Sequence, residues 1–132
     1  MLKILILEDD HFKFEHVKHC IEEALNNDCA IDHFEDYHSA GYNIFNNNYD
    51  LIVLDNTVPF WKDDPTRFID KAATCLLEEM WMEDNNTPTI ICSSDDVKAE
   101  DHWENLLGIV KYKIGNIDWE KKLIDLLTKL ME

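Results

Sequence analysis

Four carboxylates in this sequence follow apolar runs and could act together. Glu8, Asp9 and Asp10 come directly after the run KILIL, and Asp55 comes directly after the run LIVL. Carboxylates that share one crevice repel each other, so they are stable together when they share protons or bind a hard cation. Mg²⁺ suits such a set because it needs few protein carboxylates, keeps several waters and is often completed by phosphate oxygens. We therefore expect a Mg²⁺ site if the fold brings Asp55 to Glu8 and Asp9.

The same carboxylates could support chemistry at phosphorus. A carboxylate beside a bound Mg²⁺ can attack a phosphorus centre and form an aspartyl phosphate, while the metal neutralises charge on the transferred oxygens. Asp55 is the candidate nucleophile because it stands alone at the end of its apolar run. The phosphoryl oxygens would also need a hydroxyl and an ammonium, for which Ser93 and Lys113 are the candidates, with Lys111 as a second choice.

The pattern of apolar residues predicts the elements that would position these groups. Short apolar runs at 2–7, 30–34, 50–54, 88–92 and 109–114 alternate with segments of helical period at 11–26, 38–47, 65–82, 97–107 and 117–131. This alternation predicts an α/β fold with a parallel sheet. In the helix predicted over 65–82, Asp64 is a candidate N-cap and Pro65 a favourable first helical residue.

We predict a doubly wound, five-stranded parallel sheet, a flavodoxin-like (βα)5 fold with strand order 2-1-3-4-5, as one domain over residues 1–132. Three of the runs are continuously apolar, which is typical of strands covered by helices on both faces. In the predicted order the first and third strands are neighbours, and ligands bind at the carboxyl ends of such strands. The acids that end these two strands should therefore meet.

Taken together, the motifs resemble the receiver domains of two-component response regulators, over essentially the whole chain. LILEDD is similar to the acidic pair after the first strand of that family, and LIVLDNTVP to its phosphoacceptor aspartate with a proline four residues on. PTIICSSDD is similar to its fourth strand, which ends in Ser or Thr, and GIVKY to its fifth strand, which carries an aromatic switch residue.

The resemblance implies a metal site and a phosphoacceptor. Glu8, Asp9 and Asp55 would hold Mg²⁺ together with the backbone carbonyl of Thr57. Asp55 would accept a phosphoryl group from a phosphohistidine on a histidine kinase or phosphotransfer protein. The chain would then be a switch rather than a classical enzyme, with at most self-catalysed phosphoryl transfer and autodephosphorylation.

The resemblance also implies how the switch would work. Ser93 would shift to bond a phosphoryl oxygen, and Tyr112 would change rotamer, so that a protein-interaction surface is altered. The sequence ends with the fifth predicted helix, so we expect a stand-alone receiver that acts on a separate downstream protein. A homodimer through the switching face stays open.

Two departures from the family pattern leave alternatives open. Receivers usually end the fifth strand with Lys-Pro, but Gly115 and Asn116 stand at the corresponding positions. Either Lys113 or Lys111 serves the phosphate from a shifted position, or no lysine does. The loop after Asp55 is longer than usual, and its Trp61 either covers the metal crevice or simply fills the sheet edge.

Composition narrows the classes of partner. Twelve basic residues against 28 acidic ones give a net charge of −16, which argues against nucleic acid and favours a basic protein or a divalent cation. The sequence has no apolar run of membrane-spanning length and no signal peptide, and its scattered cysteines are typical of a reduced, cytoplasmic protein.

Two other functions remain under consideration. The first is a receiver-like protein-binding module that works without phosphorylation, which the missing Lys-Pro favours. The second is a Mg²⁺-dependent phosphohydrolase that forms an aspartyl phosphate on Asp55. The hydrolase is disfavoured because Thr57, rather than a second aspartate, stands two residues beyond Asp55, where an acid and base would be needed.

Overall fold

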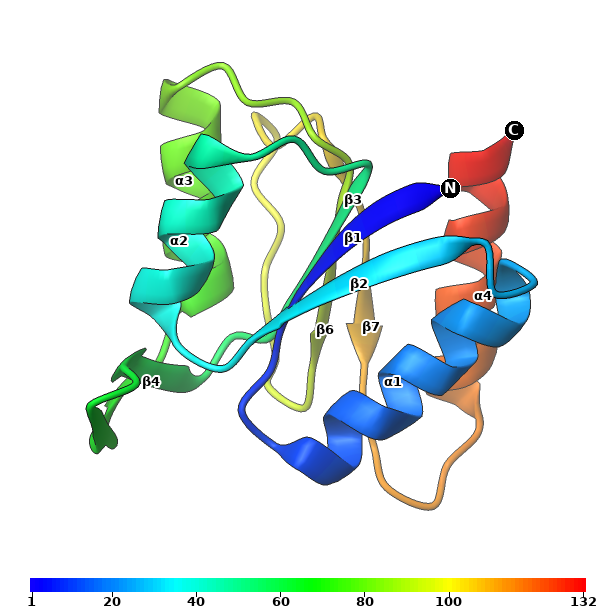
Figure 1. Ribbon diagram of the computed structural model, residues 1–132, viewed down its shortest axis with the longest axis horizontal. Helices are drawn as coiled ribbons and strands as arrows, with labels where there is room; N and C mark the ends of the chain where they lie inside the picture. The colour runs from blue at the N-terminus through cyan, green and yellow to red at the C-terminus, as the bar shows by residue number, and fades with distance from the viewer.

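The protein is built around a five-stranded parallel sheet with strand order β2-β1-β3-β6-β7 (Figure 1). The computed structural model describes residues 1–132. The sheet strands are β1 (Leu2–Leu7), β2 (Cys29–Phe34), β3 (Leu51–Leu54), β6 (Thr89–Ser93) and β7 (Leu106–Lys111). The helices are α1 (His11–Ala24), α2 (Tyr37–Asn46), α3 (Ala72–Met82) and α4 (Asp118–Met131). This arrangement confirms the predicted flavodoxin-like sheet and its order 2-1-3-4-5.

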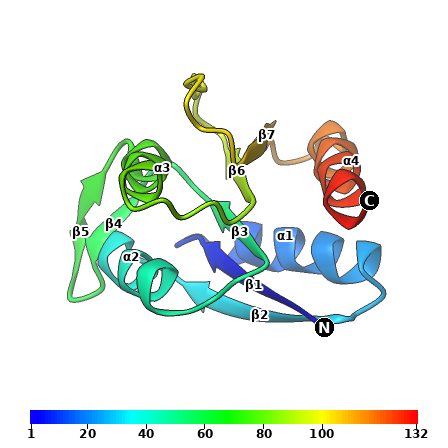
Figure 2. The same ribbon diagram turned by 90° about the horizontal axis from the view of Figure 1, so that it is seen from above.

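The helices form a layer on each face of the sheet. Helices α1 and α4 cover one face, and α2 and α3 cover the other, as the view from above shows (Figure 2). Strand β1 explains why the sheet sequences are continuously apolar. Its Ile4 and Ile6 belong to the core beneath α1 and α4, whereas Leu5 and Leu7 belong to the core beneath α2 and α3. Because successive side chains of a strand point to opposite faces, both sets must be apolar.

The prediction of a helix over 65–82 is wrong for the first part of this range. Residues 64–69 form strand β5 (Asp64–Ile69), which pairs antiparallel with β4 (Val58–Trp61) in a separate hairpin. Pro59 lies opposite Phe68 in this hairpin, and Trp61 lies opposite Asp64. Asp64 therefore does not cap a helix, and Pro65 is a strand residue. Helix α3 begins only at Ala72, whose side chain is fully buried.

The helix predicted over 97–107 is absent. Residues 94–105 contain no helix and lead from β6 directly to β7, which begins at Leu106. Trp103 takes over the packing role of the missing helix, because its side chain is only 4% exposed and lies in the core beside α3. Its indole Nε1 donates a hydrogen bond to Glu78 of α3 at 3.0 Å. One large aromatic side chain thus fills the volume that several smaller helical residues would otherwise fill.

The last strand also begins and ends earlier in the sequence than predicted. Strand β7 spans Leu106–Lys111, rather than 109–114, so Lys113 lies beyond its end. Gly108 allows close packing here, since a Cβ at this position would come within 2.9 Å of the Leu126 side chain on α4. None of the helices combines the length and the apolar character that crossing a membrane requires.

Candidate functional site

The carboxyl ends of β1 and β3 lie side by side. The two strands pair in parallel, with Leu7 opposite Leu54. The backbone N–H of Asp55 donates to the carbonyl of Leu7 at 3.0 Å, and the N–H of Glu8 donates to the carbonyl of Phe34 at 2.9 Å. The backbone ladder therefore carries Glu8 and Asp55 to the same point of the sheet edge. Carboxylate oxygens of Glu8, Asp9 and Asp55 lie within 4.8 Å of one another.

The turn after β1 separates the third acid from this cluster. Asp10 is the N-cap of α1, and its carboxylate accepts from the backbone N–H groups of Phe12 at 2.9 Å and Lys13 at 3.2 Å. These bonds satisfy two of the donors that the first turn of a helix leaves free. The N–H of Asp10 in turn donates to Glu8 Oε2 at 3.2 Å. The turn thus uses Asp10 for the helix and leaves Glu8 and Asp9 at the sheet edge.

Lys13 is a site residue that the sequence reasoning missed. Its ammonium Nζ lies 2.6 Å from Glu8 Oε1, 3.2 Å from Asp55 Oδ1 and 2.8 Å from the carbonyl oxygen of Cys92. The side chain is 8% exposed. A signal for it was present, because Lys13 stands four residues before Val17, on the buried stripe of α1. A lysine at an apolar position of an amphipathic helix indicates a buried partner for its charge.

Burial and charge perturb the acids and the lysine together. Burial raises the pKa of the Glu8 carboxyl to about 8, although the Lys13 ammonium acts in the opposite direction. Burial likewise raises the pKa of Asp9. Burial acts to lower the pKa of Lys13, but the carboxylates of Asp55 and Glu8 more than offset this, so the pKa is raised. The raised pKa values of Glu8 and Asp9 mean that, beside the single ammonium of Lys13, these acids hold protons more readily than usual, and a further cation bound there would take the place of those protons.

These residues line a hollow of about 840 Å³ at the carboxyl ends of the strands. Thr57 and Asp95 lie on its wall, and the Thr57 hydroxyl donates to the Asp95 carboxylate at 2.6 Å. Ser93 is fully buried at the end of β6, and its hydroxyl oxygen accepts from the backbone N–H of Asp95 at 3.0 Å. The hydroxyl of Ser93 therefore holds the start of the segment 94–105 close to the site.

The three predicted residues of the last strand, Lys111, Tyr112 and Lys113, also line this hollow, but none of their side chains bonds to Glu8, Asp9 or Asp55. Lys111 forms an ion pair with Asp96 at 2.6 Å. Lys113 lines the hollow but is exposed, and no ion pair joins it to Asp55. Tyr112 is buried beneath α1 and α4, where its ring packs against Trp119 with centroids 4.9 Å apart and lies 5.3 Å from the Lys13 ammonium. Trp61 lies outside this hollow, and its ring stacks on the ring of His38 in α2, with centroids 3.8 Å apart.

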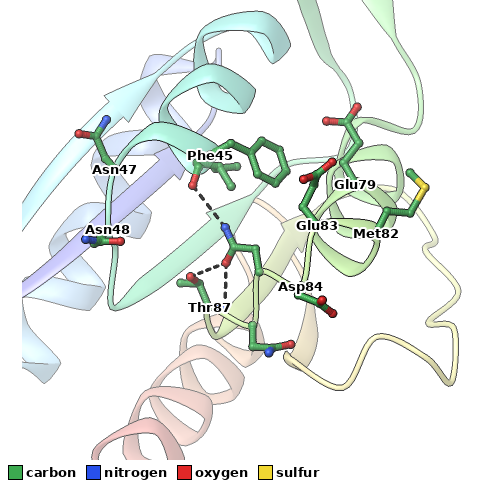
Figure 3. Close-up of a pocket in the computed structure, with 11 residues that line it drawn as sticks. Phe45, Asn47, Asn48, Glu79, Met82, Glu83, Asp84 and Thr87 are labelled. Carbon is green, nitrogen blue, oxygen red and sulfur yellow. Dashed lines mark hydrogen bonds between the residues drawn. The ribbon is translucent and has the colours of Figure 1, made fainter.

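A second hollow, of about 700 Å³, lies at the opposite edge of the sheet, between the turns that follow α2 and α3 (Figure 3). Some of its polar side chains bond to the adjoining helix or to each other. The side chain of Asn85 donates to the carbonyl of Ile44 at 3.3 Å and accepts from the Thr87 hydroxyl at 2.7 Å. Glu79 accepts from the Tyr37 hydroxyl at 2.8 Å. These bonds join helix α2 to α3 and to the turn after α3, and they indicate a structural role for this end of the sheet.

The donor set at the first hollow fits Mg²⁺. The three clustered groups are carboxylates, the oxygen ligands that this hard cation prefers. Asp9 joins no ion pair, and Asp55 Oδ2 takes part in none of the contacts of Lys13, so both offer an oxygen to a metal. Lys13 already engages Glu8 Oε1 and Asp55 Oδ1. A metal would therefore share Glu8 and Asp55 with an ammonium.

Comparison with known structures places the fold among receiver domains of response regulators. The chain resembles the response regulator TrrA of Thermotoga maritima, solved in complex with Mg²⁺ and BeF, at 20% identity and a TM-score of 0.67, over 98% of this chain and 99% of that one. It resembles the non-phosphorylated HemR receiver domain of Leptospira biflexa at 18% identity and a TM-score of 0.69, over 100% of this chain and 95% of that one. It resembles the chemotaxis response regulator CheY4 of Vibrio cholerae at 16% identity and a TM-score of 0.67, over 98% of each chain.

The resemblance is one of structure. No protein-family model matches the sequence, and no curated protein matches it. The chain has the receiver fold over its full length, with the hairpin β4–β5 inserted after the third strand of the sheet.

Proposed function

We propose that this protein is a phosphoacceptor switch, a receiver that takes a phosphoryl group on Asp55 with the help of Mg²⁺. The single observation that supports this most is the meeting of Glu8, Asp9 and Asp55 at the carboxyl ends of two neighbouring strands. The donor in the cell would be a phosphohistidine on a cytoplasmic histidine kinase or phosphotransfer protein. The output would be a change in a surface recognised by another protein.

In the proposed reaction, a carboxylate oxygen of Asp55 attacks phosphorus, and the bond from phosphorus to the donor breaks. When the donor is phosphohistidine, the leaving imidazole keeps the bonding pair and takes up a proton from water. When bound, Mg²⁺ would neutralise charge on the transferred oxygens, held by Glu8, Asp9, Asp55 and the backbone carbonyl of Thr57. The Ser93 hydroxyl would turn from Asp95 to a phosphoryl oxygen. Reorientation of Tyr112 stays a prediction.

The proposal is tested by incubating the protein with Mg²⁺ and a small phosphodonor such as acetyl phosphate, then measuring intact mass. We expect one added phosphoryl group per chain, and none when the metal is removed with a chelator. Continuous consumption of the donor without a stable adduct would instead support the phosphohydrolase. Absence of both modification and Mg²⁺ binding would overturn the proposal and leave the phosphorylation-independent binding module.

The metal ligands can be tested separately from the phosphoryl transfer. We expect Asp9→Ala to weaken Mg²⁺ binding more than tenfold, which corresponds to about 1.4 kcal/mol, because a carboxylate ligand is lost. Isothermal titration calorimetry with MgCl₂ measures this directly. Glu15→Ala removes an exposed carboxylate from α1 and is expected to change the affinity by only about twofold, since salt screens exposed charges. Equal affinities in the two variants would exclude Asp9 as a ligand.

A second candidate function is supported by one observation. The ammonium of Lys13 already bonds to Glu8 and Asp55, so the acidic cluster is partly neutralised by the protein itself. A receiver-like module that binds a partner without phosphorylation would need such an arrangement to keep its buried acids stable. The phosphodonor experiment separates this module from the switch.

A further inference from the structure

We propose that Lys13, on the first helix, is the lysine that binds the phosphoryl group on Asp55. This inference rests on the proposed function, since it names the residue that would stabilise the transferred oxygens. The expected source was the end of the last strand, where Lys113 and Lys111 were the candidates. The structure instead brings an ammonium to Asp55 from a different element, helix α1.

The contacts of Lys13 provide an oxygen partner for each of the three donors of its ammonium. An ammonium has three N–H donors, and three oxygens surround Nζ, from Glu8 at 2.6 Å, Cys92 at 2.8 Å and Asp55 at 3.2 Å. The carbonyl of Cys92 comes from the end of β6, so the contacts join three parts of the molecule: β6, the turn after β1 and the end of β3. The longest of the three contacts is the one to Asp55, the residue that would react.

The environment of Lys13 gives the ammonium a defined position. The side chain is 8% exposed, and it lies against the ring of Tyr112, with Nζ 5.3 Å from the ring centroid. A charge held in a partly dry site acts more strongly on a developing anion than a mobile one at the surface. Lys113 and Lys111 are both exposed, and the ammonium of Lys111 is already paired with Asp96. Neither of them has a comparable position.

The proposed role involves no proton transfer from Lys13. When Asp55 forms its bond to phosphorus, its carboxylate becomes neutral, the bonding pair leaves with the donor group, and the transferred phosphoryl oxygens bring their own negative charge to the site. The ammonium exchanges its contact with Asp55 Oδ1 for one with a phosphoryl oxygen and keeps its bonds to Glu8 and the Cys92 carbonyl. The ammonium stays protonated throughout, so Lys13 adds no bond change and no proton transfer to the phosphoryl transfer described above.

This role predicts opposite changes in two measurements on Lys13→Met. Phosphoryl uptake from acetyl phosphate should slow roughly 100-fold, the scale that follows loss of one donor to a developing anion. Mg²⁺ should bind roughly tenfold more tightly, because a positive charge beside its carboxylates is removed. Lys18→Met, a matched change of a half-buried lysine on the same helix, should alter neither value. A general folding defect would weaken both instead of separating them.

The experiment uses the whole protein, with rates followed by intact mass and Mg²⁺ affinity by calorimetry. Lys13→Gln is the second variant, because it keeps a hydrogen-bond donor near Cys92 without the charge, and it should show the same pair of changes. Uptake in Lys13→Met at the wild-type rate, with Asp55-dependent uptake in the wild type, would overturn the role of Lys13 and leave the proposed function intact. Loss of uptake in Lys113→Met alone would also overturn it. No uptake by the wild type would overturn both.

Discussion

Replacing Asp55 by Asn is expected to abolish phosphoryl uptake while leaving the fold intact. An amide is a far weaker nucleophile than a carboxylate, so the bond to phosphorus should not form. The fold should persist because an amide oxygen can still accept the bonds that Asp55 Oδ1 receives from the Asn56 N–H at 2.8 Å and from Lys13 at 3.2 Å. One negative charge fewer in the acidic cluster also relieves repulsion.

The measurement is intact mass after incubation with acetyl phosphate and Mg²⁺, with a thermal melt of the same samples. Asp125→Asn provides the matched control, since Asp125 is an exposed aspartate on α4, and it should take up the phosphoryl group as the wild type does. Undiminished uptake by the Asp55 variant would mean that another side chain is the acceptor. An unchanged melting temperature with no uptake assigns the loss to the missing carboxylate, and a melting temperature lowered to the assay temperature would contradict the expectation that the fold persists.

Replacing Trp103 by Ala is expected to have the largest effect on stability. We expect a loss of about 3 to 5 kcal/mol in the free energy of unfolding, the usual cost of truncating a buried tryptophan. The side chain is 4% exposed, packs in the core beside α3 and donates to Glu78 at 3.0 Å. Its removal leaves a cavity and also takes the indole donor away from Glu78.

Urea unfolding measures this effect as a lower midpoint with an unchanged slope. Trp81→Ala is the matched control, because Trp81 is 53% exposed on α3 and should cost no more than about 1 kcal/mol. Similar midpoints for the two variants would contradict the view that Trp103 anchors the segment 94–105 to the core.

The sheet and the cluster of acids at the carboxyl ends of its strands could be predicted from the sequence because the strands carry a strong signal. The continuous apolar runs are buried on both faces, and their order follows from the rules of doubly wound sheets. That order makes β1 and β3 neighbours, and this alone brings Asp55 to Glu8 and Asp9. The carboxylate cluster was therefore predictable without any knowledge of side-chain packing.

The predicted and observed structures differ where the sequence signal is ambiguous. Asp64 and Pro65 suit the start of a helix, but Phe68 and Ile69 can equally pair with Pro59 and Val58 in a hairpin, and only tertiary context decides. Lys13 depends on its tertiary partners too. A lysine on an apolar stripe is visible in the sequence, but its partners come from β1, β3 and β6, and no local pattern specifies all three.

The segment 94–105 is held in place by polar contacts along its length and by one buried side chain near its end. Near its start, Asp95 bonds to Thr57 and Ser93 at the wall of the hollow that Asp55 lines, and Asp96 pairs with Lys111 at 2.6 Å. Near its end, Trp103 lies in the core beside α3. A phosphoryl group on Asp55 would add negative charge to the hollow that Asp95 also lines, and this would weaken the contacts of Asp95 with Thr57 and Ser93. The packing of Trp103 in the core would not change. The proposed phosphorylation would therefore first change the contacts of Asp95, at the start of a segment in which residues 98–101 are exposed.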